Sequence, residues 1–128
     1  MNELIREWID KADSDYRSAD RELYPTEGKP NFDLTCYLCQ QCVEKYLKGL
    51  LQHHGAAFPR THDLVVLLDL IIPFYPLWEA WRASFRTLKD YAAEFRYPGE
   101  SANPRIAVNA FKLATTFREQ ARDAFGIS

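Results

Sequence analysis

The chain of 128 residues has no long hydrophobic run, no large excess of charge of one sign and only three cysteines. Its longest apolar stretch, around residues 64–72, is much shorter than the roughly 20 residues that a membrane-spanning helix needs, so we expect no membrane span. The net charge of −2 gives no general attraction for nucleic acid, and such binding would require a local basic patch. Disorder is not expected, because 47% of the residues are hydrophobic.

The N-terminal segment is charged from its third residue, which is not the pattern of a secretory signal peptide. An odd number of cysteines without a secretory signal is typical of proteins in a reducing compartment. We therefore expect a cytoplasmic protein. The length suits one domain with a hydrophobic core, and no repeat or linker divides the chain, so we predict a single domain over residues 1–128.

Apolar residues recur at intervals of three and four, and no segment alternates with period two, which predicts an all-α fold. Asn31 and Thr61 are expected N-caps, Gly55 follows a helix end, and Asn103 with Pro104 forms a cap and a first helical position. The expected long helices cover about 3–22, 32–54, 77–95 and 104–125, and a short helix follows Thr61. This is an up-and-down bundle of four long helices plus one short helix.

The three cysteines, Cys36, Cys39 and Cys42, form a C-x-x-C-x-x-C pattern that could indicate an iron–sulfur or metal site. On a helical wheel, however, they fall on the apolar half of the second helix. A fourth ligand and a glycine-containing loop are missing, and the first and third cysteines are about 9 Å apart along a helix. We therefore predict that the cysteines pack in the core, and we expect no metal and no cofactor.

Three short motifs follow one another along the chain, after an N-terminal helix that carries Ala12, Asp13 and Ala19. They are Q-Q-C-V-E-K-Y-L-K at 40–48, T-H-D-L at 61–64 and R-Y-P at 96–98. Together they resemble the HEPN (higher eukaryotes and prokaryotes nucleotide-binding) family over nearly the whole chain. The resemblance implies a helical bundle that is usually dimeric. It also implies a partner, because members are often encoded beside a small nucleotidyltransferase in toxin–antitoxin-like pairs.

Many HEPN proteins are ribonucleases whose signature is an arginine followed, after four to six intervening residues, by a histidine. The histidines here are His53, His54 and His62, and none has an arginine at that spacing. Arg60 lies only two positions before His62, and no histidine follows Arg96. Acid–base cleavage needs a group that titrates near neutrality. We therefore expect no RNA cleavage by the mechanism of the family's nucleases.

The second and third helices provide the first ligand-binding candidates. Gln41, Lys45 and Lys48 could bind phosphate, or could form a solvated helix face with a pair between Glu44 and Lys48. His62 and Asp63 open the third helix, where free amides could hold an anion; the alternative is capping with a hydrogen-bonded histidine. The adjacent His53 and His54 are expected to contact the carbonyls at the end of the second helix.

The fourth helix provides the other candidates. Arg82, Arg86 and Lys89 fall on one basic stripe, and Arg96 would extend it if the helix ran on. The stripe could follow a nucleic-acid backbone, or its side chains could lie over aromatic neighbours with their charges in water. Arg96 and Tyr97 leave this helix in an extended segment before proline, where they could face a ligand or fasten the loop to the bundle.

Two function classes remain. The first is a dimeric module that binds a nucleotide or RNA and assembles with a nucleotidyltransferase. The alternative is a metal-independent ribonuclease with a non-standard site that uses Arg96, Tyr97 and His62. A homodimer is also expected because the chain has 18 aromatic residues (3 Trp, 7 Tyr and 8 Phe), and a small bundle is expected to leave some of them exposed, with Trp78 and Trp81 beside the basic stripe.

Overall fold

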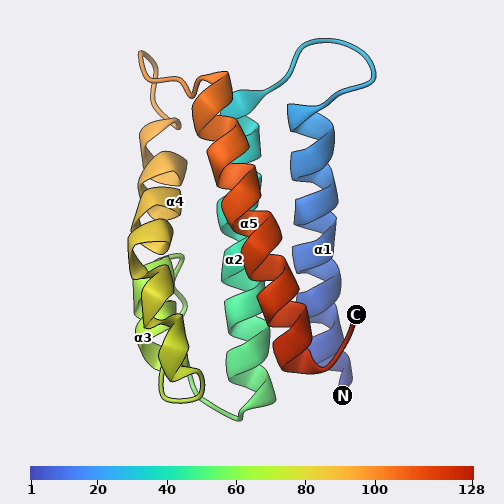
Figure 1. The fold of residues 1–128 in the computed structure, drawn as a ribbon, viewed down its shortest axis with the longest axis vertical. Helices are drawn as coiled ribbons and strands as arrows, with labels where there is room; N and C mark the ends of the chain where they lie inside the picture. Colours follow the sequence, from blue (N-terminus) through green and yellow to red (C-terminus); the bar gives the residue numbers. More distant parts are fainter.

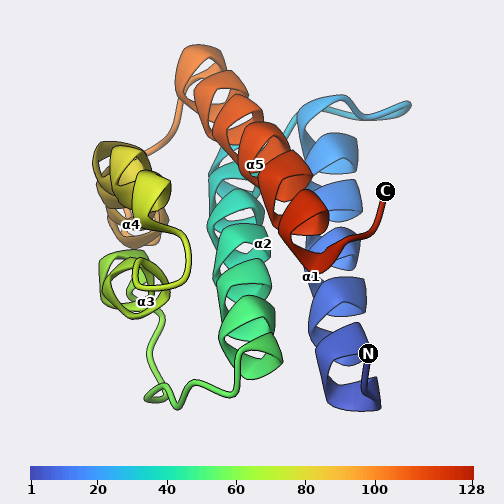
Figure 2. The ribbon, with the colours of Figure 1, turned by 60° about the horizontal axis from the view of Figure 1, so that its bottom comes forward.

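The computed structural model describes all residues 1–128 and shows a helical bundle without strands (Figure 1), which confirms the all-α prediction. The elements in chain order are α1 (Glu3–Leu23), α2 (Phe32–His53), α3 (Leu64–Ile71), the 3₁₀ helix η1 (Pro76–Trp81), α4 (Arg82–Glu94) and α5 (Pro104–Phe125). The two termini lie near each other at one end of the bundle (Figures 1 and 2). None of the helices has both the length and the apolar character that crossing a bilayer requires.

The second helix, α2, is the central element, and it packs against α1, α3, α4 and α5. Figures 1 and 2 show it between α1 on one side and the α3–α4 pair on the other. Gly49 lets Trp8 of α1 and Phe125 of α5 approach α2 closely, because a Cβ atom there would lie 3.0 Å from the Trp8 Cβ atom and 3.2 Å from the Phe125 ring. Because other helices surround α2, even some of its polar residues are buried.

Cys36, Cys39 and Cys42 are fully buried on this continuous helix, which confirms their predicted placement in the core. Burial raises the pKa of the Cys36 thiol to about 12 and raises the pKa of the other two thiols well above their usual range. The thiols therefore stay protonated near neutral pH, a form that is a poor metal ligand. No group of three or more His, Cys, Asp or Glu side chains is placed to hold a metal ion.

The observed N-caps of α2, α3 and α5 agree with the predicted ones except at α3. Asn31 and Asn103 cap α2 and α5 as predicted, each accepting a hydrogen bond from an amide three residues later. The cap of α3 is Asp63 rather than Thr61: its carboxylate accepts from amides two and three residues later, at 2.9 and 3.4 Å. Thr61 instead accepts a hydrogen bond from the Asp63 amide at 3.1 Å. The prediction was wrong by two residues because both side chains are good caps.

The region predicted as one helix over 77–95 consists of two elements. Pro76 opens the 3₁₀ helix η1, and α4 begins only at Arg82 and ends at Glu94. A 3₁₀ helix has three residues per turn, so Trp78 and Trp81 fall on the same side and both point inward. Leu77, at the start of the predicted helix, is 89% exposed.

The two tryptophans are covered within their own bundle, each only 9% exposed. Both pack edge-on against Phe117 of α5, and the indole N–H of Trp81 donates to Gln120 at 2.8 Å. These two side chains therefore add no exposed aromatic surface, and they give no support to a dimer.

A polar network joins the other side of α2 to α1 and α5. Asp13 of α1 accepts hydrogen bonds from the Tyr46 hydroxyl, from Arg118 Nε at 3.2 Å and from Arg122 at 2.7 Å. The carboxylate is 14% exposed, so several donors are needed to offset its desolvation. These contacts fix α1 and α5 around α2.

Candidate functional site: a cleft between α2 and α4

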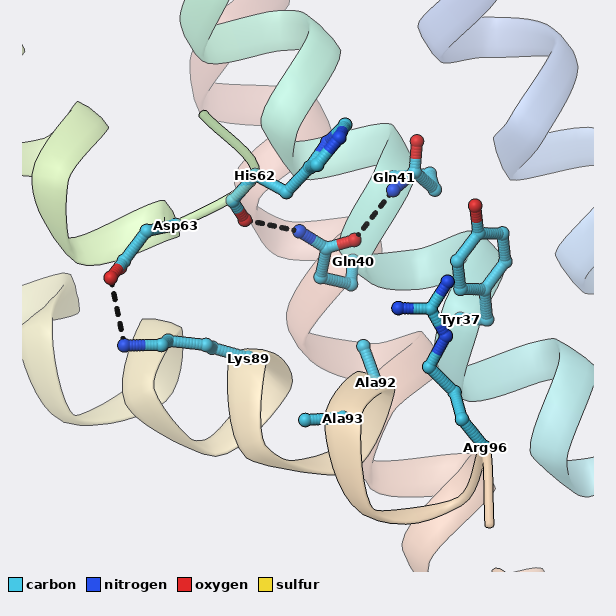
Figure 3. A pocket seen from close by; sticks show the side chains of 9 residues that line it. All are labelled: Tyr37, Gln40, Gln41, His62, Asp63, Lys89, Ala92, Ala93 and Arg96. Carbon is cyan, nitrogen blue, oxygen red and sulfur yellow. Dashed lines mark hydrogen bonds and ion pairs between the residues drawn. The ribbon is translucent and has the colours of Figure 1, made fainter. Parts of the chain in front are cut away.

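A cleft of about 280 Å³ lies between α2, the segment before α3 and the C-terminal part of α4 (Figure 3). Two helices and the short segments beside them thus contribute to one hollow. Its lining residues are Tyr37, Gln40 and Gln41 from α2; His62 and Asp63 before α3; Lys89, Ala92 and Ala93 from α4; and Arg96 just after α4.

The side chain of Glu44 lies behind the cleft and is only 4% exposed. Its carboxylate accepts from Gln40 Nε2 at 3.2 Å, from Lys48 Nζ at 3.0 Å and contacts His62 Nδ1 at 3.0 Å. A buried carboxylate is stable only with such donors. The predicted pair between Glu44 and Lys48 therefore exists, but it is buried and does not form a solvated face.

His62 is held from two directions. Its ring contacts Glu44 through Nδ1, while its backbone carbonyl accepts from Gln40 Nε2 at 2.9 Å (Figure 3 shows the second contact). The side chain is otherwise 81% exposed. Because the carboxylate accepts a hydrogen bond from Nδ1, the neutral imidazole keeps its proton there and presents the lone pair of Nε2 to its surroundings. This leaves one proton acceptor with a defined orientation at the edge of the cleft.

Asp63 and Lys89 form an ion pair of 2.8 Å across the cleft (Figure 3). Burial acts to raise the pKa of the Asp63 carboxyl, but the hydrogen bonds from Lys89 and from two helix amides outweigh it and hold that pKa below its usual value. The carboxylate thus caps α3 and binds α4 at the same time. The charge of Lys89 is largely neutralised by this contact.

Arg96 is the cation of the cleft that has no ion-pair partner. Its guanidinium lies 5.7 Å from the centre of the Tyr37 ring, a cation–π contact between the end of α4 and α2 (Figure 3). The contact holds the arginine in position while leaving its N–H donors available. Ala92 and Ala93, with their small side chains, leave room beside it.

The cleft brings together four of the predicted site residues, Gln41, His62, Asp63 and Arg96. Lys48 lies outside it and uses its ammonium group on Glu44, with its charge also 5.9 Å from the centre of the Trp8 ring.

Three other candidates also lie away from the cleft. Lys45 faces α1 and pairs with Asp15 at 2.6 Å. Arg86, on the exposed side of α4, makes no ion pair. Tyr97 is 69% exposed and follows Arg96 in the turn after α4.

Two aspects of this region were missed from the sequence. Tyr37 was not considered, although it lies one helical turn before Gln41 and therefore on the same face. The prediction for His54 was also wrong: its ring hydrogen-bonds the Tyr75 hydroxyl at 2.7 Å and stacks on Phe74, instead of contacting carbonyls at the helix end. Both partners come from the segment after α3, so one helix separates them from His54 in the sequence.

A family model for the HEPN domain matches residues 5–124. The chain belongs to the HEPN family. A comparison with curated proteins found no match.

Two solved structures resemble this HEPN bundle. The crystal structure of TT1696 from Thermus thermophilus has a TM-score of 0.78 and 20% identity, covering 93% of this chain and 96% of that one. The structure of ST0689, an archaeal HEPN homologue, has a TM-score of 0.70 and 21% identity, covering 94% and 96%. At this level of identity the likeness shows the shared fold.

The contact between His62 and Glu44 predicts the tautomer of the histidine. In ¹⁵N spectra recorded well above the ordinary imidazole pKa of about 6.5, neutral His62 is expected to carry its proton on Nδ1. His53, whose ring nitrogens have no hydrogen-bond partner, is the internal reference, and a His62→Gln variant assigns the signals. Protonation of His62 on Nε2 would contradict the structure.

Proposed function

We propose that this HEPN protein is a binding module that holds a nucleotide or a short stretch of RNA in the cleft without cutting it. The observation that carries the proposal is Arg96, a cation without a carboxylate partner, held against Tyr37 in the wall of a cleft. A guanidinium donates paired hydrogen bonds to phosphate, and a tyrosine face can stack on a base.

The other polar groups of the cleft suit the same ligand. Gln41 donates to Gln40 at 2.9 Å and keeps its own carbonyl oxygen available for a base or ribose donor. His62 offers the lone pair of Nε2. The volume of about 280 Å³ is close to the lower end of the range for small-molecule sites, which suits part of a nucleotide better than a large cofactor.

Cleavage is not part of the proposal, because the arginine–histidine spacing of the family's nucleases is missing. One observation favours a second candidate function, a metal-independent ribonuclease. Glu44 orients His62, and a carboxylate–histidine pair is an arrangement used for proton transfer. A nuclease of this kind would use His62 as the acid–base group and Arg96 to stabilise charge on the phosphate.

We further propose that the module acts as a homodimer beside a small nucleotidyltransferase, in a toxin–antitoxin-like system. Family membership supports both parts of this proposal. The dimer has additional support from exposed apolar side chains around η1, where Leu77 is 89% exposed and Phe74 is 41% exposed. Apolar surface of this kind is common at interfaces.

Binding to the cleft is tested with ATP and with a labelled single-stranded RNA as probes. Arg96→Gln is expected to weaken binding of both about tenfold or more, since a hydrogen bond to a charged group contributes about 1.5–3 kcal/mol. Arg17→Gln, on the exposed face of α1, is the matched control and should change nothing. The same affinity in the Arg96→Gln and wild-type proteins would contradict the proposal.

The same RNA samples, incubated without metal, separate the two candidate functions. The binding module leaves the strand intact in every variant. Cutting by the wild-type protein that His62→Gln abolishes would instead establish the ribonuclease.

Sedimentation at micromolar concentration tests the dimer. The expected particle has about twice the 14.9 kDa mass of the chain, and Leu77→Arg is expected to shift it toward the monomer. Leu4→Arg introduces the same change at a half-exposed leucine of α1 and serves as the control. A 14.9 kDa particle for the wild-type protein would reject the homodimer.

A further inference from the structure

A second hollow, a groove of about 800 Å³, lies between the C-terminal part of α4 and the N-terminal half of α5. Tyr91 contributes from α4, and Arg105, Asn109 and Lys112 contribute from α5. Tyr91 is two residues from Lys89 and therefore about 200° away from it around α4. The groove and the cleft thus lie on different sides of the same helix.

The two cations of the groove lie on one stripe of α5. Arg105 and Lys112 are seven positions apart, which is two helical turns and about 10 Å along the axis, with Asn109 between them. Both are exposed, and neither belongs to an ion pair. Their charges are therefore free to bind an external anion.

The groove also differs from four other hollows in its acidic content. No carboxylate lines it. Each of the four others has at least one acidic residue in its wall. These residues are, hollow by hollow, Asp63, Glu7, Asp33, and the pair Asp10 and Asp13. In a chain with 18 acidic and 16 basic residues, two unpaired cations without a nearby carboxylate in the wall form a locally positive surface.

Tyr91 provides the remaining part of the site. It is half-buried, and its ring packs against Phe95 with the ring centres 5.8 Å apart, so its orientation is fixed. An aromatic side chain beside a basic stripe is the combination that binds single strands, because every base can stack on it and the cations follow the backbone. A single phosphate could not reach both cations, since they are about 10 Å apart, whereas successive phosphates of a strand could.

We propose that this groove, formed by Tyr91, Arg105, Asn109 and Lys112, binds the phosphodiester backbone of a single-stranded nucleic acid. It is a site separate from the cleft, and it does not depend on what the cleft binds. A strand that occupied both would be held more tightly than a mononucleotide, because the second contact would be intramolecular.

The test compares the full-length wild-type protein with the double variant Arg105→Gln/Lys112→Gln. Fluorescence anisotropy measures the affinity for a labelled single-stranded RNA, about 12 nucleotides long, between about 50 and 200 mM salt. Removing two phosphate contacts is expected to reduce the slope of log K against log salt by about 1.4, since each contact on a single strand contributes about 0.7. Affinity for ATP should stay unchanged.

The matched control is Arg6→Gln/Arg17→Gln, which removes the same charge from exposed positions of α1, on the opposite side of the bundle from α4 (Figure 1). It should leave the salt slope unchanged. Tyr91→Ala should weaken RNA binding without changing the slope, because stacking releases no counterions. Thermal unfolding checks that each variant is folded. A DNA strand of the same sequence shows whether the groove accepts any single strand or RNA alone.

Three results would overturn the proposal. The first is an equal change of slope in the groove and control variants, which would show a general charge effect. The second is displacement of the RNA by polyglutamate with no effect of Tyr91→Ala, which would indicate an acidic protein partner. The third is a change of oligomeric state in the groove variants, which would make this surface an interface between copies. The affinity for ATP reports on the cleft alone, so it shows whether the proposal for the groove or the proposal for the cleft is wrong.

Discussion

The carboxylate of Glu44, buried in the middle of the central helix, is the constraint on which the site depends. Its charge requires donors, and these come from Lys48 and Gln40 of α2 and from His62 of the segment before α3. That segment is therefore fastened to α2 in one position. Asp63, the next residue, caps α3 and reaches Lys89 of α4. A chain of polar contacts thus runs from the core of α2 to α4 and determines where the cleft lies.

The opposite side of α2 is organised by the same principle. Asp13 of α1 accepts hydrogen bonds from the hydroxyl of Tyr46 and from the guanidinium groups of Arg118 and Arg122. One carboxylate therefore joins α1, α2 and α5. Such networks cost desolvation free energy, but they also specify a single arrangement of the helices. The result is a rigid frame from which Arg96 and Tyr37 project into the cleft. A preorganised cation in a small hollow suits binding of a phosphate-containing ligand.

Much of the fold could be predicted from the sequence because helical periodicity and capping are local. The placement of Cys36, Cys39 and Cys42 on an apolar face and the caps at Asn31 and Asn103 follow from residues within one or two turns. The switch from η1 to α4 could not be predicted, since 3₁₀ and α-helical turns have similar sequence patterns. Its consequence, the outward position of Leu77, was missed for that reason.

The site could be predicted only in part. Gln41, His62, Asp63 and Arg96 were named from the sequence, and the structure places them around one cleft. A helical wheel shows which residues share a face but not whether another helix covers that face, so the burial of Glu44 was not foreseen.

The buried pair of Glu44 and Lys48 organises this half of the bundle, and its contribution can be measured directly. The measurement is a double-mutant cycle of the free energy of unfolding with Lys48→Met, Glu44→Gln and the double variant, determined by chemical denaturation. Lys48→Met alone is expected to destabilise the protein by about 1.5–3 kcal/mol, because the buried carboxylate loses its ammonium partner and keeps only Gln40 and His62. Adding Glu44→Gln should recover most of that loss, with a coupling energy above about 1 kcal/mol. Additive effects of the two substitutions would contradict the account.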